Sequence, residues 1–308
     1  MPVSRLNAPK HGLFVGLTTL DISYLTVAPP DRNQKIVALD CTMAAGGPAT
    51  NAAVTFRYLG NRATLLSAVG VHPMTQLVLT DVRQRGVAVA DLDPNRMQSL
   101  PISSIIVTQS TGERAVVSLN ATKSQVSSEA IAQALGDRIP VDTLAGVDVV
   151  LVDGHQMAVG RAIAGRANAY HIPVVIDAGS WKAGFEQVLC QANFVIASAN
   201  FYPPGCQTTA DVFAYLTHLG IPHMAVTRGG EAIQFSSEGR TGTIPIPQAS
   251  VVDTLGAGDI FHGAFCHYII QTSFAEALAQ AAAVAARACQ SFGTRQWMDA
   301  SRQQGIES

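Results

Sequence analysis

The second half of the chain alternates short apolar runs with longer helical patterns, and this rhythm restricts the folds that are open to it. The apolar runs span 147–153, 172–178, 193–198 and 223–228. The helical patterns span 157–170, 207–219, 260–270 and 274–292. Strands that are apolar on both faces and are separated by helices form parallel sheets with helices on each side. The alternation therefore predicts an α/β protein with a mostly parallel central sheet in a three-layer α/β/α arrangement.

Two β-rich parts of the first half fall outside this alternation. Residues 102–109 and 115–120 are joined by the turn sequence STGER, which is typical of a hairpin. A further β-rich stretch, 35–39, follows a turn that contains prolines. These parts, about 31–45 and 99–120, predict a small antiparallel flap beside the main sheet, or merely an edge hairpin. Because no repeat or linker interrupts the sequence, we expect one domain over residues 1–308, with the flap as part of it.

Composition narrows the class of protein further. Of the 308 residues, 48% are hydrophobic and 14% charged, which indicates a large buried interior. The net charge of −2 and the lack of basic runs exclude a nucleic-acid-binding role, which needs a basic surface. No apolar stretch is long enough to cross a bilayer, and the N-terminus lacks the apolar core of a signal peptide. The five cysteines are odd in number and lack zinc spacing, as in a reducing compartment. We therefore expect a cytoplasmic protein with neither nucleic-acid nor membrane partners.

The segment DTLGAGDIFHGAF, residues 253–265, carries the clearest chemical signal. Gly256, Ala257 and Gly258 precede an acid and an apolar helical run. Small residues let the unpaired N–H groups of a helix start approach an anion closely. A carboxylate at Asp259 would repel that anion unless it takes a proton from a group that attacks the anion, which favours phosphoryl transfer to a hydroxyl. The alternative is that Asp259 only caps the helix and Gly-Ala-Gly is only a tight turn.

The same segment resembles the C-terminal signature of the ribokinase-like (PfkB) carbohydrate kinases. A second signature of that family, a paired glycine followed by Asn, is matched by Gly46, Gly47 and Asn51. Together the resemblance covers roughly residues 12 to 298. It implies a ribokinase-like fold in which the β flap is a lid over the sugar, with Asp259 as catalytic base. It also implies that the backbone of residues 256–258 forms the anion hole, and that Asp253 steadies the loop or helps to hold a cation.

Residues that would bind the acceptor come from the first half of the chain. Open parallel sheets bind ligands beyond the carboxyl ends of their strands, and Asp21 follows the apolar run LFVGLTTL. From the residues alone, a solvated acid that ends a strand and begins a turn is the better explanation of Asp21, but in the resembling family an acid there grips sugar hydroxyls, and the resemblance favours that role. Gly46 and Gly47 would let the backbone press on a polyol, and the Asn51 amide would donate to and accept from hydroxyls. The alternative is a plain turn. On the family interpretation, Gly47→Val should weaken sugar binding with little loss of fold.

Two further residues are candidates for the acceptor side. Asp153 lies at the end of an apolar run, where many relatives place an acid near the sugar or the lid, although Asp-Gly is also a common turn. Arg114, on the expected lid, is a candidate for contacting a phosphate or sulfonate group of the acceptor.

On the expected nucleotide side, the sequence matches the family's pattern at some residues and departs from it at the magnesium motif. The chain lacks GxxxxGK[ST], so its ATP site is no P-loop. Thr227 and Gly229 match the VTxG segment that lies along the nucleotide phosphates in the family, and Gly256 and Gly258 complete that side. The family's Asn-x-x-Glu, which helps to place magnesium, is replaced by Ser198 and Phe201, and Ser198 is a further candidate for the nucleotide site. The resemblance therefore implies ATP and Mg²⁺, with the ion held mainly by phosphates and water, and leaves its protein ligands unknown. Restoring the acid by Phe201→Glu should lower the Mg²⁺ requirement. A monovalent cation is a further candidate, with Asp253 as a cation-loop residue.

The resemblance implies an ATP-dependent sugar kinase that transfers the γ-phosphoryl group to a hydroxyl of a ketohexose- or ribose-like sugar or sugar derivative. One alternative is a nucleoside kinase of the adenosine type on the same fold. Another is a sugar-binding relative without catalytic activity. An exposed lid sheet could pair with that of a second copy to form a homodimer.

Overall fold

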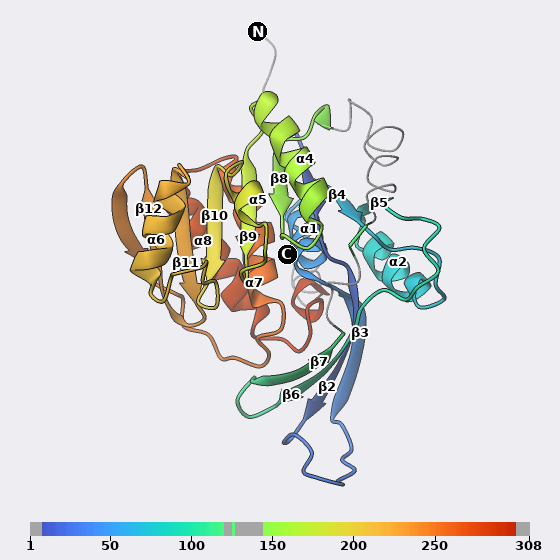
Figure 1. Cartoon of the computed structure of the whole chain (residues 1–308). Helices are drawn as coiled ribbons and strands as arrows, with labels where there is room; N and C mark the ends of the chain where they lie inside the picture. The colour runs from blue at the N-terminus through green and yellow to red at the C-terminus, as the bar shows by residue number, and fades with distance from the viewer. Residues whose placement is uncertain (1–7, 120–124, 127–143, 300–308) are drawn as a thin grey trace.

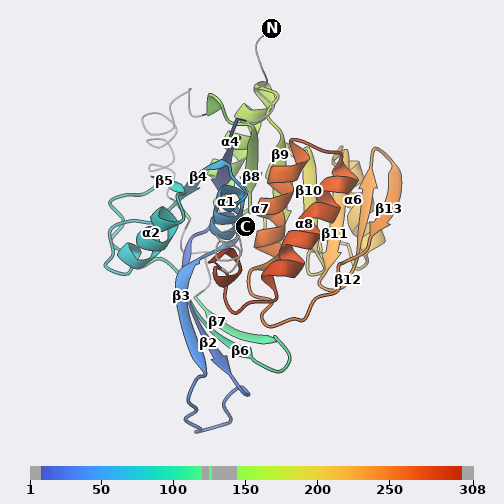
Figure 2. The ribbon, with the colours of Figure 1, turned by 180° about the vertical axis from the view of Figure 1, so that it is seen from behind.

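The computed structural model describes residues 8–119, 125–126 and 144–299. A large sheet has helices on both faces, and a smaller sheet projects from it (Figure 1). Helices α4, α5 and α6 cover one face, whereas α1, α7 and α8 cover the other, which Figure 2 shows from behind. The three-layer α/β/α expectation is confirmed.

The large sheet has nine strands in the order β13-β12-β11-β10-β9-β8-β1-β4-β5. Their bounds are β1 His11–Val15, β4 Arg62–Ser67, β5 Ala88–Asp91, β8 Val149–Val152, β9 Val174–Ala178, β10 Phe194–Ser198, β11 His223–Arg228, β12 Glu231–Ser237 and β13 Arg240–Ile244. Every pairing from β5 to β11 is parallel, and β12 and β13 add an antiparallel edge. Every residue of β8 and β9 is buried, as expected for strands covered on both faces.

The helices are α1 Pro48–Tyr58, α2 Thr75–Gln84, α4 Met157–Ala169, α5 Glu186–Leu189, α6 Thr209–His218, α7 Ala257–Ile269 and α8 Phe274–Ala288. One core lies between the sheet and α1, α7 and α8, and a second lies between the sheet and α4, α5 and α6. Helix α8 is capped by Ser273, which exchanges hydrogen bonds with Glu276, but it ends earlier than the expected 292. Its terminal Cys289 carbonyl instead accepts hydrogen bonds from the backbone N–H groups of Val252 and Asp253. In the described part of the chain, every helix is too short or too polar to cross a membrane.

The small sheet, called the lid below, has the order β3-β2-β6-β7. Its strands are β2 Thr19–Thr26, β3 Asp40–Gly46, β6 Ile102–Thr108 and β7 Arg114–Ser118. The central pair β2 and β6 is parallel, and the outer pairs are antiparallel.

Two boundaries differ from the sequence-based expectation. The run 13–20 is not one strand ending at Asp21, because the chain leaves the large sheet after β1 and Asp21 lies inside β2. The break falls at Gly16, where a Cβ atom would lie 2.1 Å from the Asp153 carboxylate. The stretch 35–39 is not a strand, since β3 starts at Asp40.

Candidate active site

Helix α7 begins at the segment that the sequence singled out. Gly256 precedes its first residue in the left-handed conformation, with φ of 68°, and a Cβ atom there would lie 2.8 Å from Cγ2 of Thr294. A Cβ atom on Gly258 would meet nothing within 4 Å. Asp259 stands in the first turn of α7. The backbone of 256–258 therefore forms an exposed helix start with an acid beside it, as the motif predicts.

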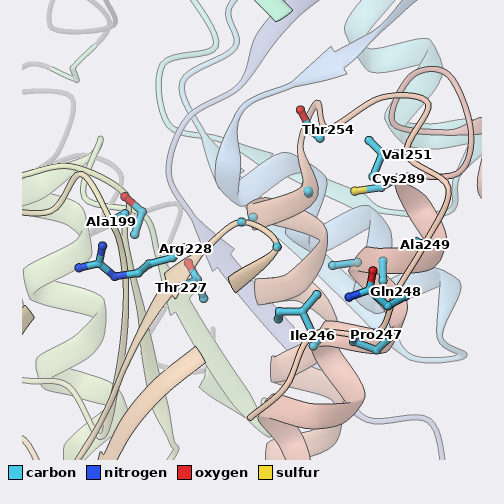
Figure 3. Close-up of a pocket in the computed structure, with 18 of the residues that line it drawn as sticks. Ala199, Thr227, Arg228, Ile246, Pro247, Gln248, Ala249, Val251, Thr254 and Cys289 are labelled. Carbon is cyan, nitrogen blue, oxygen red and sulfur yellow. The ribbon is translucent and has the colours of Figure 1, made fainter. Parts of the chain in front are cut away.

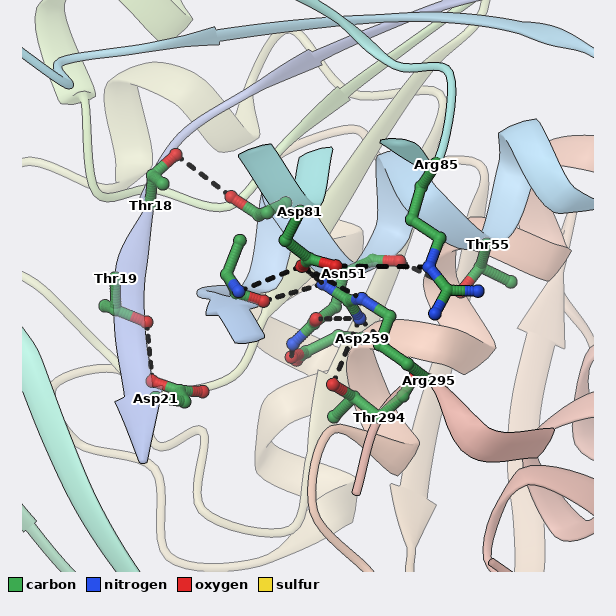
Figure 4. Close-up of polar contacts among 12 residues, drawn as sticks. Thr18, Thr19, Asp21, Asn51, Thr55, Asp81, Arg85, Asp259, Thr294 and Arg295 are labelled. Atoms are coloured by element: carbon green, nitrogen blue, oxygen red, sulfur yellow. Dashed lines mark hydrogen bonds and ion pairs between the residues drawn. The ribbon is translucent and has the colours of Figure 1, made fainter. Parts of the chain in front are cut away.

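The Asp259 carboxyl group is half-buried, and its removal from water raises its pKa from the ordinary 3.8 to about 7. Nearby Asp177 raises the pKa further, as Asp21 does more weakly, whereas a hydrogen bond from Asn51 and the ring of His262 act in the opposite direction. Nδ2 of Asn51 donates to Oδ2 of Asp259 at 2.8 Å (Figure 4). A carboxyl group with a pKa near neutrality is well suited to accept a proton at ordinary pH.

Behind Asn51 lies an arginine that the sequence analysis did not single out. Arg295 donates from Nη1 to Oδ1 of Asn51 at 2.9 Å, and from Nη2 to the Ala45 carbonyl at 2.6 Å. Its Nε donates to Oδ2 of Asp81, on α2, at 3.2 Å. Figure 4 shows Asp81, Arg295, Asn51 and Asp259 as one connected group. A lone arginine near the end of the chain carries no motif, so no sequence signal could have identified it.

Asp21 lies on β2, at the base of the lid. Oγ1 of Thr19 donates to its Oδ1 at 2.7 Å, and burial raises the pKa of the carboxyl group while hydrogen bonds from Thr19 and Ser103 oppose that rise. A Cβ atom on Gly46 would lie 2.0 Å from Oδ2 of Asp21, so the glycine makes room for the acid. The structure thus brings Asp21, Gly46, Asn51 and Asp259 into one region.

Gly47 is constrained by the fold itself. Its φ is 98°, and a Cβ atom would lie 2.3 Å from the Leu17 carbonyl oxygen. A side chain would therefore collide with backbone, which cannot move as a flexible side chain can. The expectation that Gly47→Val leaves the fold nearly intact is wrong.

Asp153 does not reach the acceptor side as expected. It is buried, and its Oδ2 accepts from the N–H groups of Leu17 at 2.8 Å and Ala49 at 3.2 Å. Its Oδ1 accepts from the N–H of His155 at 2.9 Å. The carboxylate therefore braces the turn between β1 and β2 against the start of α1, and we correct its assignment from acceptor contact to bracing.

Arg114 also lies elsewhere than expected. From the start of β7 it donates to Oγ1 of Thr254 at 2.7 Å and to the Thr254 carbonyl at 3.2 Å. Thr254 in turn donates to the Gly112 carbonyl at 3.3 Å. Arg114 thus ties the lid to the loop before α7, and it lines the pocket described next rather than the region around Asp21, so its assignment to the acceptor side is corrected.

A pocket of about 570 Å³ opens on the other side of the α7 start (Figure 3). This volume lies within the range of small-molecule sites. One wall is apolar and comes from α8 and residues 246–251, and the opposite wall is the backbone after β10 and β11. Of the residues expected to bind nucleotide, Ser198, Thr227, Gly229 and Gly258 line this pocket, whereas Gly256 does not.

Metal ligands remain unidentified. In the described residues, no group of three or more His, Cys, Asp or Glu side chains is placed to hold an ion. Asp253 accepts from the N–H groups of Leu255 at 2.8 Å and Gly293 at 2.9 Å, which fits a residue that steadies the loop. Phe201 is 1% exposed and packs on the Trp181 and Phe185 rings. A glutamate there would enter this aromatic cluster, so Phe201→Glu is not the metal-restoring change that the motif comparison suggested.

A half-buried carboxyl group therefore stands at a helix start, between polar residues at the base of the lid and a pocket with one largely apolar wall. The pfkB family carbohydrate kinase model matches residues 11–300, and the chain belongs to this family, whose members are phosphotransferases with an alcohol group as acceptor. Ribokinase of Lactococcus lactis is 24% identical over 91% of both chains. Ketohexokinase of Mus musculus is 28% identical over 39% of this chain and 40% of its own length. A solved structure described as a putative ribokinase from Agrobacterium tumefaciens has a TM-score of 0.80 at 24% identity, over 98% of this chain and 100% of its own.

Proposed function

We propose that this protein is an ATP-dependent kinase that phosphorylates a hydroxyl group of an uncharged sugar or sugar-like polyol. The observation that carries the proposal is Asp259, a half-buried carboxyl group with a pKa raised to about 7, which stands at an open helix start between the two ligand regions. Its placement combines a proton acceptor with an anion-binding backbone, which are the two requirements of phosphoryl transfer to an alcohol.

In the proposed reaction Asp259 takes the proton of the attacking hydroxyl. The backbone N–H groups at the start of α7 stabilise the charge that develops on the transferred phosphoryl group. Asp21 and the Asn51 amide orient the acceptor, and Gly46 leaves space for Asp21 beside it. Thr227, Gly229 and Ser198 border the nucleotide, with Arg114 reaching the same pocket from the lid. Mg²⁺, bound mainly through the phosphates and water, would neutralise phosphate charge.

Charge on the acceptor side favours an uncharged substrate. Asp21 and Asp259 are both acids, and Arg295 has its donors engaged by Asp81, Asn51 and the Ala45 carbonyl. Arg114 faces the nucleotide pocket instead. In the described part of the chain we therefore find no uncommitted cation on the acceptor side to hold a sugar phosphate or sugar acid.

A substrate panel with ATP tests the proposal. We expect transfer to a neutral ketohexose or to ribose, with sugar phosphates at least tenfold less efficient in kcat/KM, a loss of about 1.4 kcal/mol of transition-state stabilisation. Transfer to none of these, together with sugar binding, would favour the non-catalytic alternative. Preference for adenosine would favour the nucleoside alternative, for which a solved adenosine kinase from Sinorhizobium meliloti with a TM-score of 0.72 is a precedent for the fold.

Three further expectations belong to this proposal: one catalytic domain that includes the lid, a cytoplasmic location, and pairing of two copies through the lid. Exposed apolar side chains on β3 and β7, at Met43, Val116 and Val117, support pairing. Light scattering of the purified protein tests it, and a mass of one chain at all concentrations would refute it.

A further inference from the structure

The contact with Arg295 determines which way the Asn51 amide is turned. An arginine side chain carries only donors, so the atom of Asn51 that faces Nη1 of Arg295 at 2.9 Å must be the carbonyl oxygen. The amide nitrogen is then turned to Oδ2 of Asp259. The assignment of oxygen and nitrogen in this amide therefore follows from hydrogen-bond chemistry.

Arg295 is itself held from several sides. Asp81 on α2 and the Ala45 carbonyl at the end of β3 accept from it, and Nη1 also donates to Oγ1 of Thr294 at 3.0 Å. The residue is 7% exposed and lies behind Asn51 (Figure 4). A guanidinium group with all its partners fixed in this way offers one rigid donor to Asn51.

We propose that Arg295, held by Asp81, is a positioning residue that acts on Asp259 through the Asn51 amide. The inference rests on the proposed function in that Asp259 is the base whose position matters. Because Asn51 occupies Oδ2 of Asp259, the other carboxylate oxygen, Oδ1, is the atom left to receive the proton of the acceptor. Through Asn51, Arg295 thus keeps Oδ2 of Asp259 as the acceptor for the amide and leaves Oδ1 as the proton acceptor.

Loss of Arg295 would free the amide to rotate. A rotated amide would turn its carbonyl oxygen toward the carboxylate, replacing an attraction with a repulsion. The ionised form of Asp259 would be disfavoured, and its pKa would rise. The other groups that face Asp259 are Asp177 from β9, Asp21 from β2 and His262 from α7. Among the described residues, the hydrogen bonds of Arg295 reach none of these three, but its charge lowers the pKa of Asp21. Loss of Arg295 would therefore also make Asp21 less charged, which lowers the pKa of Asp259 and opposes the rise caused by the rotated amide.

The test is a direct titration of Asp259 by NMR of carboxyl-labelled aspartate in the full chain, with the resonance assigned by Asp259→Asn. In Arg295→Met we expect the pKa of Asp259 to rise by about one unit, the size expected for one charge-assisted hydrogen bond. The acid limb of the kcat/KM profile should move upward by the same amount, while activity recovers at high pH. A residue with a merely structural role would lower the melting temperature without moving this titration.

The matched control is Arg85→Gln. Arg85 faces the other oxygen of Asp81, with Nε 3.9 Å from Oδ1, and pairs with Asp299, but it has no hydrogen bond to Asn51. Its removal should leave the pKa of Asp259 unchanged. An equal shift in both variants would show that charge near Asp81 matters rather than the contact with Asn51, and would overturn the proposal.

A double-mutant cycle separates action through Asn51 from action through space. In an Asn51→Ala background, Arg295→Met should cause no further shift in the pKa of Asp259, whereas two additive shifts would refute the relay. An unchanged pKa in folded Arg295→Met would refute it as well. If Arg295→Met does not fold, Arg295→Lys is the substitute variant. It retains the positive charge beside Asp81 but loses the several fixed donors of the guanidinium group. For the proposal to stand, it must show the same upward shift in the pKa of Asp259. Because the NMR titration needs no turnover, failure of the relay and failure of the proposed activity are distinguishable.

Discussion

The two sides of Asp259 are built in different ways, and their glycines show the difference. On the acceptor side, Cβ atoms on Gly46 and Gly47 would lie 2.0 Å from Asp21 and 2.3 Å from the Leu17 carbonyl. On the nucleotide side, Cβ atoms on Gly229, Gly230 and Gly258 would meet nothing within 4 Å. The acceptor-side glycines are in close contact with other parts of the chain, whereas the glycines of the proposed nucleotide side face open space. Preorganisation of the chemistry thus lies on the acceptor side.

The largest expected effect comes from the residue between the two sides. Asp259→Asn keeps the shape and still accepts a hydrogen bond from Asn51, but it removes the proton acceptor, so kcat should fall by at least about a hundredfold. ATP affinity should be equal or improved, because a negative charge beside the phosphates is gone. Steady-state kinetics and nucleotide titration measure both quantities. A folded variant that retains more than about a tenth of the wild-type kcat would contradict the catalytic role.

A pair of glycine variants tests the contrast itself. Gly258→Ala should leave thermal stability equal or slightly higher, since alanine favours a helix by up to about 1 kcal/mol, yet it should raise the KM for ATP about tenfold by filling ligand space. Gly47→Ala should lower the melting temperature markedly, because it combines a left-handed backbone with a collision. Thermal denaturation and ATP kinetics of both variants give the comparison. Equal destabilisation by the two changes would remove the distinction between the sides.

The pH profile of kcat/KM reports on the carboxyl group of Asp259. With a pKa of about 7 in the free enzyme, activity should rise with pH through neutrality. At one pH unit below the pKa, kcat/KM should be about a tenth of its plateau. An acid limb near pH 4 instead would show that Asp259 titrates as an ordinary surface acid.

The raised pKa of Asp259 also predicts how the free energy of unfolding depends on pH. Between the ordinary pKa of 3.8 and about 7, the folded state holds a proton on Asp259 that the unfolded state has lost. The free energy of unfolding should therefore decrease as pH rises through this window, and the decrease should be smaller in Asp259→Asn. Denaturant titrations of the two proteins between pH 4 and 8 measure the difference.

The smallest expected effect is at the lid. Arg114→Met removes the contact with Thr254 and a cation from the nucleotide pocket, so the KM for ATP should rise severalfold while that for the sugar stays nearly constant. Exposed ionic contacts are worth about 1 kcal/mol or less, which limits the change to about fivefold. A variant with a changed sugar KM alone would return Arg114 to the acceptor side.

Local sequence patterns were sufficient for the layers and for the central helix start. The strands from β8 to β11 are continuous apolar runs because both of their faces are buried, and such runs are visible without a structure. The α7 start was predictable because its glycines and acid are adjacent in sequence. The break between β1 and β2 was not, because it depends on the approach of Asp153 to Gly16 from 137 positions away.

By itself, the sequence determined the three-layer fold, the family resemblance and the position of Asp259, since each depends on neighbouring residues or on regular spacing. Only the tertiary structure decided what several polar side chains face. Asp153 meets backbone N–H groups and Arg114 meets the nucleotide side because of where β1, α1 and the lid converge. Asn51 joins Asp259 across 208 positions and Arg295 across 244. Hydrogen bonds of such separation are formed by packing of the whole chain, and no local pattern encodes them.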